Sequence, residues 1–181
     1  MTRHLLQLGG ASVLAVLLAA CSPLQSSSTR TPTIVDAPVS PGRADAILVE
    51  KGQRRLSLLQ GGRVLKSYKV SLGRNPVGDK LEEGDGRTPE GDYFIDWRKP
   101  NSAYYKALHV SYPHRSDYYD AREAGRSPGG AIMIHGLPNK RPNATWMRNI
   151  DWTEGCIAVT NTEMDEIWRS VRDGTPIRIV P

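Results

Sequence analysis

Short apolar runs separated by glycine and proline fill residues 44–181, and this pattern constrains the fold most strongly. The runs 46–50 and 131–135 are too short for helices and have the length of buried strands. The chain also carries 17 glycines and 13 prolines, which favour turns over long helices. We therefore expect one compact, mostly β domain, a β-sandwich or mixed sheet, over residues 44–181.

The same pattern predicts the individual strands. A first strand covers 46–50, and a hairpin turns at Gly61-Gly62, with apolar residues on both sides of it. The segment 88–95 is a turn that leads into a strand, because Pro89 and Gly91 punctuate it. A final strand covers 175–180. Residues 97–130 are rich in tyrosine, proline and charge, so we expect a long loop excursion there with only short strands such as 108–110.

One late helix is predicted near the C-terminus. Thr160 and Glu163 have the spacing of a capping box, which satisfies free amides at a helix start. Four apolar residues then recur with helical spacing and form one face, namely Met164, Ile167, Trp168 and Val171.

The first twenty residues have the pattern of an export signal. Arg3 and His4 precede an uncharged run over 5–20, which is too short for a typical membrane-spanning helix. The run ends Leu-Ala-Ala before Cys21, which resembles a bacterial lipoprotein signal peptide. This resemblance implies cleavage before Cys21 and lipidation of that cysteine. We expect a membrane-anchored lipoprotein that faces the periplasm, and Ser22 favours the outer membrane.

Residues 21–43 are expected to form a tether between the lipid and the domain. Serine, threonine and proline dominate this segment, and no apolar periodicity runs through it. The net charge of the whole chain is +5, but residues 44–181 carry 21 basic and 18 acidic side chains. Together with the export signal, this small excess argues against a nucleic-acid partner.

Cys156 is the only cysteine left in the domain if Cys21 carries lipid. A lone cysteine is either a small buried hydrophobe or a nucleophile paired with a base. Gly155 allows a tight turn before Cys156, and His135 ends a predicted buried strand. An imidazole in reach would accept the thiol proton, and the Gly136 carbonyl is a candidate to orient that ring. The amides of Gly155 and Cys156 are candidate oxyanion donors.

Three ordered motifs carry a family resemblance. Thr-Pro-x-Gly at 88–91, Ile-His-Gly at 134–136 and Thr-x-Gly-Cys-Ile at 153–157 together resemble the L,D-transpeptidase catalytic-domain family. The resemblance implies a compact β domain, with Cys156 as nucleophile, His135 as base and the Gly136 carbonyl as orienting group. The sequence departs from the common family pattern at Glu154, where histidine is usual, and at Ala158, where arginine is usual.

The resemblance also implies a function. The chain is expected to be an acyltransferase that acts on peptidoglycan stem peptides through a cysteine thioester, without a cofactor or metal. A hydrolase of the same class stays open as an alternative, acting on a wall peptide or releasing a wall-linked lipoprotein. A non-catalytic peptidoglycan-binding lipoprotein is the alternative from another class. Candidate substrate-binding residues are Trp152, Thr153, Glu154, Tyr105 and Arg148.

Overall fold

The structure is a computed structural model that describes residues 43–181. The signal and lipidation predictions, including Cys21, and the predicted tether up to residue 42 lie outside the described residues. Eight strands form one mixed sheet in the order β3-β2-β1-β8-β4-β5-β6-β7. Their bounds are β1 Ala46–Glu50, β2 Arg55–Gln60, β3 Arg63–Lys69, β4 Gly91–Ser102, β5 Tyr105–Val110, β6 Met133–His135, β7 Ile157–Ala158 and β8 Pro176–Val180. The expectation of a mostly β mixed sheet is confirmed.

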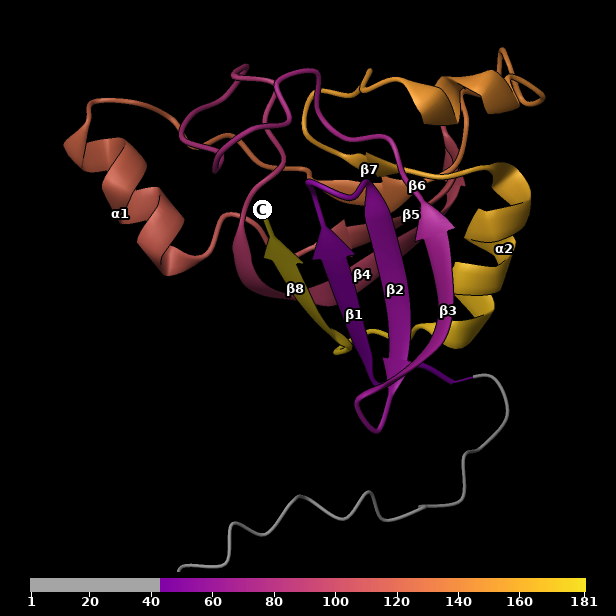
Figure 1. Ribbon diagram of the computed structural model, residues 1–181. Helices are drawn as coiled ribbons and strands as arrows, with labels where there is room; N and C mark the ends of the chain where they lie inside the picture. The colour runs from indigo at the N-terminus through magenta and orange to yellow at the C-terminus, as the bar shows by residue number, and fades with distance from the viewer. Residues whose placement is uncertain (1–42) are drawn as a thin grey trace, which may run out of the picture. The chain divides into compact units, whose positions relative to one another are not determined.

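The long strand β4 folds this sheet into two layers. Its first residues pair with β8, and its later residues pair with β5 after a break in register between Ile95 and Arg98. Such an irregularity bends a strand and increases its twist. In Figure 1, β4 and β5 accordingly pass behind β1 and β2. Two parallel pairs, β1 with β8 and β6 with β7, occur among otherwise antiparallel neighbours.

The two ends of the sheet are joined by a backbone bridge. Ser71, just after β3, exchanges both backbone hydrogen bonds with Ala158 of β7. Gly73 then bridges to Thr153 in the loop before β7. The segment after β3 therefore hydrogen-bonds the outer edge of β7, so this last strand of the sheet has no unpaired edge at Ala158.

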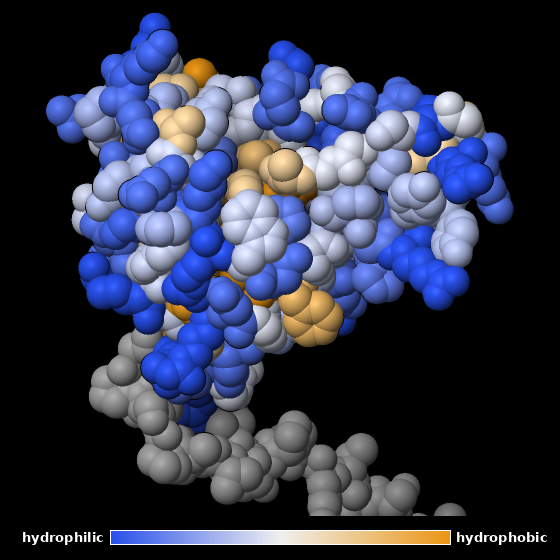
Figure 2. Space-filling model, turned by 180° about the vertical axis from the view of Figure 1, so that it is seen from behind, coloured by the Kyte–Doolittle hydropathy of each residue, from blue (hydrophilic) through white to orange (hydrophobic). Residues whose placement is uncertain are grey.

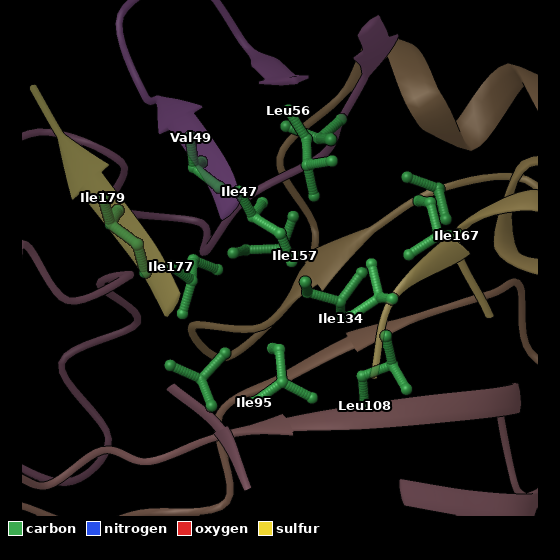
Figure 3. Close-up of a cluster of buried hydrophobic side chains, with 14 of the residues drawn as sticks. Ile47, Val49, Leu56, Ile95, Leu108, Ile134, Ile157, Ile167, Ile177 and Ile179 are labelled. Carbon is green, nitrogen blue, oxygen red and sulfur yellow. The ribbon is translucent and has the colours of Figure 1, made fainter. Parts of the chain in front are cut away.

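The core fills the space between the two layers. Figure 3 shows aliphatic side chains from β1, β8, β4, β5, β6 and β7 pointing toward one another. The labelled residues among them are almost completely buried, namely Ile47, Val49, Leu56, Ile95, Leu108, Ile134, Ile157, Ile167, Ile177 and Ile179. Ile134 and Ile157 point into this core, so their neighbours His135 and Ala158 point to the other side of the sheet.

Helix α2, Asn161–Ser170, is the helix that the sequence predicts. Thr160 caps it, and Glu163 reaches back to the Thr160 amide, so the capping box is present. Met164 and Ile167 are fully buried, and the helix packs against β5 and β6. It ends at Ser170, slightly before Asp173-Gly174, where the sequence suggests its end.

The expectation of a long loop over 97–130 is wrong for most of that range. Strand β4 continues to Ser102, β5 returns from Tyr105, and a second helix, α1, covers Arg115–Glu123. Irregular register in the hairpin hides the alternation that identifies a strand. Helix α1 buries only Ala121, so it lacks the apolar face on which a helix prediction rests. A short 3-10 helix, η1, covers Thr145–Asn149.

A buried lysine fixes the long loop between β3 and β4 onto β1. The side chain of Lys51 is almost inaccessible, and its Nζ donates to the carbonyl oxygens of Gly78 and Thr88 and to Glu90 Oε1. A buried ammonium is tolerated only when such partners replace its water. Lys51 therefore holds the loop that runs past the beginning of β4.

We predict that Lys51→Met lowers the free energy of unfolding by about 3 kcal/mol, because it leaves Glu90 and two carbonyl groups without their partner. The control is Arg55→Met, which removes an exposed pair with Glu50 and should cost less than about 1 kcal/mol. Urea unfolding followed by circular dichroism measures both values. Equal losses in the two variants would contradict the structural role of Lys51.

Candidate active site

His135 ends β6 and points to the side of the sheet opposite the core. Its neighbour Ile134 points into the core, and the ring of His135 is 3% exposed. The strand pairs on one side with β5, where His135 lies opposite Ala107, and on the other with β7, where it lies opposite Ala158. Both flanking residues are small, which leaves room for the imidazole between the strands.

The backbone of Gly136 orients this ring. His135 Nδ1 lies 2.7 Å from the Gly136 carbonyl oxygen, which can only accept a hydrogen bond, so Nδ1 donates. In the neutral ring Nε2 then carries the lone pair. A Cβ on residue 136 would come within 2.5 Å of Asn161 Oδ1 and 3.2 Å of the Tyr104 carbonyl oxygen. The close packing therefore requires glycine at the position that supplies the carbonyl.

The pairing of β6 with β7 brings Cys156 to the same face. Ile134 lies opposite Ile157, so Cys156, one residue earlier, falls beside Met133. Residues two apart in a strand share a face, so Met133 and His135 point to the same side as Cys156. Cys156 and His135 both line one cleft of about 370 Å³. Cys156 Sγ donates a long hydrogen bond of 3.6 Å to the Ala131 carbonyl oxygen.

The surroundings favour the uncharged forms of both groups. Burial lowers the pKa of His135 to about 4, against a smaller opposite effect of its bond to Gly136. Burial raises the pKa of the Cys156 thiol, opposed by a backbone hydrogen bond at Met133 and by the charge of Lys80. At neutral pH the site therefore holds a thiol and a neutral imidazole. The neutral imidazole can accept a proton, and a thiolate forms only when Cys156 gives up its thiol proton.

Two aromatic rings enclose His135. Tyr104 lies 4.7 Å from the imidazole between ring centroids, and Trp152 lies 5.7 Å away, nearly perpendicular to it. The two rings are themselves 5.9 Å apart, and both line the cleft. They keep water from the imidazole, which is the physical origin of its lowered pKa.

The loop before Cys156 is fixed at several points. Asp151 accepts two hydrogen bonds from Arg54 Nε and Nη2, and its Oδ1 also accepts from the Leu72 amide. The Thr153 hydroxyl donates to the Cys156 carbonyl oxygen at 2.7 Å and accepts from the Gly155 amide at 3.2 Å. These bonds determine the direction in which the chain enters β7, and thus the place of the thiol.

The predicted site residues divide into two groups. Trp152, Thr153 and Glu154 line the cleft together with Cys156 and His135. Tyr105 and Arg148 are not among its lining residues. The Tyr105 hydroxyl donates to Asp165 of α2, and the Arg148 guanidinium pairs with Glu163 at 3.2 Å.

The Gly155 amide, one of the two candidate oxyanion donors, is not free in this structure. The Gly155 amide is already bonded to the Thr153 hydroxyl, so its part in an oxyanion hole would require that bond to be given up. Glu154 forms an ion pair with Arg74 at the mouth of the cleft, with both side chains more than half exposed. Both oxyanion roles stay predictions.

Sequence reasoning missed several residues of the cleft. Tyr104, Lys99, Ala107 and Met133 contribute to its lining. The β4–β5 hairpin supplies the first three, so they were hidden in the segment expected to be a loop. Extending the predicted strand 108–110 by one residue would have placed Ala107 on the face opposite Leu108, because neighbouring strand residues face opposite sides.

Residues 43–181 contain no group of three or more His, Cys, Asp and Glu side chains placed to hold a metal ion. Within the same residues, neither helix has the length and apolar character that crossing a membrane requires. His109 of β5 forms a hydrogen bond with Asp96.

Taken together, the geometry places a cysteine and an oriented histidine in one cleft of a twisted mixed sheet. A family model for the L,D-transpeptidase catalytic domain of the YkuD type matches residues 44–179. The chain belongs to this family.

Relatives of known sequence agree with this assignment. A protein of Escherichia coli K12 named "Putative L,D-transpeptidase YafK" is 32% identical over 179 residues. The match covers 89% of this chain and 63% of that protein. The chain thus spans less than two thirds of the length of the curated relatives that it matches.

Solved structures show the same fold. Pgp2 of Campylobacter jejuni, described as a helical cell shape determining protein, has a TM-score of 0.57 and 26% identity, covering 74% of this chain and 46% of its own. Bd1075 of Bdellovibrio bacteriovorus has a TM-score of 0.50 and 29% identity, covering 75% and 47%. An L,D-transpeptidase from Mycobacterium smegmatis shares the fold, with a TM-score of 0.50, 14% identity and coverage of 75% and 58%.

We predict that Gly155→Ala distorts the loop that carries Cys156. Gly155 has a φ of +129°, and an added Cβ would lie 2.5 Å from the Arg87 carbonyl oxygen. The control is Gly174→Ala, at a φ of +87°, where nothing lies within 4 Å. We expect a loss of about 1 kcal/mol at position 174 and a distinctly larger loss at position 155, measured by urea unfolding. Equal losses would show that the close approach at Gly155 is unimportant.

A second prediction concerns pH. The His135 pKa is about 4 in the folded protein and about 6.5 in an unfolded chain, so the unfolded state binds more protons between these values. This contribution to the unfolding free energy is complete above about pH 6.5 and falls by about 3 kcal/mol as the pH approaches 4. His135→Gln should remove this part of the pH dependence. If the unfolding free energies of wild type and variant change equally with pH across this range, the assignment is contradicted.

Proposed function

We propose that this protein is a peptidoglycan-modifying L,D-transpeptidase that works through a thioester on Cys156. The observation that carries the proposal is that Cys156 and His135 line one cleft, while the Gly136 carbonyl fixes Nδ1 of His135. Membership of the L,D-transpeptidase family supports the choice of substrate class.

The first half of the reaction forms the thioester. His135 Nε2 accepts the proton of the Cys156 thiol as Sγ attacks the carbonyl carbon of an amide in the stem peptide. This amide joins the L-centre of a diamino acid to a terminal D-amino acid. The C–N bond breaks, and the protonated His135 gives its proton to the departing amine. The products are a free D-amino acid and an acyl group on Sγ.

The second half transfers the acyl group. The amine of another stem peptide or of a wall-linked protein attacks the thioester carbon and loses a proton to His135 Nε2. The C–S bond breaks, and the leaving sulfur regains a proton from His135. Each step uses only the cysteine, the histidine and nearby hydrogen-bond donors.

The charges at the cleft fit an anionic peptide. Lys99 lines it, while the carboxylate of Glu154 is paired with Arg74. A stem peptide with free carboxylates would therefore meet one uncompensated cation beside one neutralised anion. Glu154 occupies the position where the family commonly has histidine, so we propose that it tunes the choice of acceptor.

The location is part of the same proposal. We propose export to the periplasm and anchoring in the outer membrane through a lipid on Cys21. Labelling of growing cells with an alkyne fatty acid should mark the wild-type protein and not Cys21→Ser. Label that persists in Cys21→Ser would contradict the anchor.

The activity is tested with the purified full chain, tetrapeptide muropeptides and mass spectrometry of the products. We expect crosslinked dimers together with a released D-amino acid. Cys156→Ala should abolish both products, and His135→Gln should slow them about 10²- to 10⁴-fold, because it removes the general base. A loss of the terminal residue without dimers would identify a hydrolase. Wild-type products equal to those of Cys156→Ala would refute the enzymatic function.

A further inference from the structure

A stacked pair of aromatic rings, of which Trp97 is exposed, extends the candidate active site along β4 and β5. The indole of Trp97 and the imidazole of His109 are stacked, with 4.7 Å between ring centroids and an interplanar angle of 15°. Trp97 is 42% exposed, although it is one of the largest apolar groups in the protein. His109 Nδ1 is held by Asp96 Oδ1 at 2.6 Å. The exposed indole of Trp97 thus presents a flat ring backed by His109, which the Asp96 carboxylate holds, and these three residues are called here the aromatic platform (Trp97, His109 and Asp96).

Strand register places this platform on the same face as Cys156. In the pairing of β5 with β6, Ala107 lies opposite His135 and His109 lies opposite Met133. Alternate residues share a face, and Ala107, Met133 and His135 all line the catalytic cleft. His109 is therefore in the row that runs through Met133 to Cys156. Trp97 continues this row onto β4.

The distance along this row suits a short peptide. Neighbouring strands are about 4.8 Å apart, so three strand intervals from β4 to β7 span about 14 Å. An extended peptide covers at most about 3.5 Å per residue, so about four residues bridge the platform and the thiol. The three residues that precede the reacting amide of a tetrapeptide span at most about 10.5 Å, so the sugar ring and its link to the peptide cover the remaining few ångströms to the platform.

The chemistry of the platform fits a sugar ring. A pyranose has an apolar face of C–H groups, which packs on an aromatic ring, and hydroxyl groups at its edge, which donate to a carboxylate such as Asp96. Asp96 would repel a phosphate or a nucleic acid. In Figure 2, which views the molecule from behind, small hydrophobic areas interrupt a mostly hydrophilic surface.

We propose that the aromatic platform binds a pyranose ring of the glycan strand that carries the reacting stem peptide. The proposal rests on the proposed function for the identity of the substrate. It assigns a saccharide subsite to Trp97, His109 and Asp96, outside the residues that line the cleft. Its effect would be to orient the peptide along the face that leads to Cys156.

Binding is tested first without catalysis. The full chain with Cys156→Ala is labelled with fluorotryptophan, and Trp97→Phe in this background assigns one of the four tryptophan signals. Titration with the tetramer of β-1,4-linked N-acetylglucosamine should shift the Trp97 signal. A Trp97 signal that does not move, or moves no more than the other three, would overturn the proposal.

The second test compares two substrates, the disaccharide-tetrapeptide and the same tetrapeptide without sugar. Trp97→Ala should reduce the preference in kcat/KM for the glycosylated substrate about tenfold, chiefly through KM. Trp97→Phe should restore most of this preference, because it keeps a ring. The matched control is Phe94→Ala, which removes another exposed aromatic of β4, from a groove with Pro176 and Arg178.

An unchanged preference in Trp97→Ala, or an equal fall in Phe94→Ala, would overturn the saccharide subsite. If neither peptide is turned over by the wild type, the proposed function fails. A shift of the Trp97 signal by the sugar tetramer would in that case still support the subsite. The two failures are therefore distinguishable.

Discussion

The parallel pairing of β6 with β7 is the constraint on which the candidate site depends. Both strands are very short, so each depends on its neighbours, β5 beside β6 and Ser71 beside β7. Their register places Cys156 one residue before the pairing begins and His135 at its end, on one face. The Val159 amide closes the pair by donating to the His135 carbonyl oxygen. This register brings Cys156 and His135, which are distant in the sequence, into one cleft.

Packing on both sides maintains the register. Ile134 and Ile157 anchor the pair in the core, and Ser71 bonds the free edge of β7. The same burial lowers the pKa of His135 and raises that of Cys156. The fold therefore supplies a neutral base beside a neutral thiol, rather than an ion pair formed in advance. In the proposed reaction, charge would develop there only as Sγ attacks the substrate.

Local signals in the sequence were sufficient for much of this structure. The capping box of Thr160 and Glu163 predicts α2, and Gly61-Gly62 predicts the β2–β3 hairpin, because each depends on neighbouring residues alone. The pairing of Cys156 with His135 was predicted from their motifs, not from a contact that the sequence displays. Helix α1 and the β4–β5 hairpin were missed, since exposed charges and a register break obscure both periodicities. Tyr104 lines the cleft where Tyr105 was expected, because Tyr104 lies in the turn of the β4–β5 hairpin while the Tyr105 hydroxyl bonds to Asp165 of α2.

The central claim is that Cys156 carries the acyl group during the reaction. Intact-protein mass spectrometry after rapid mixing of the full chain with a tetrapeptide muropeptide, followed by an acid quench, tests it directly. We expect the protein to gain a mass equal to the substrate less its terminal D-amino acid. This adduct should lie on the peptide that contains Cys156, and hydroxylamine should release it. An adduct on another residue would contradict the claim. Substrate turnover with no adduct in samples quenched early in the reaction would also contradict it.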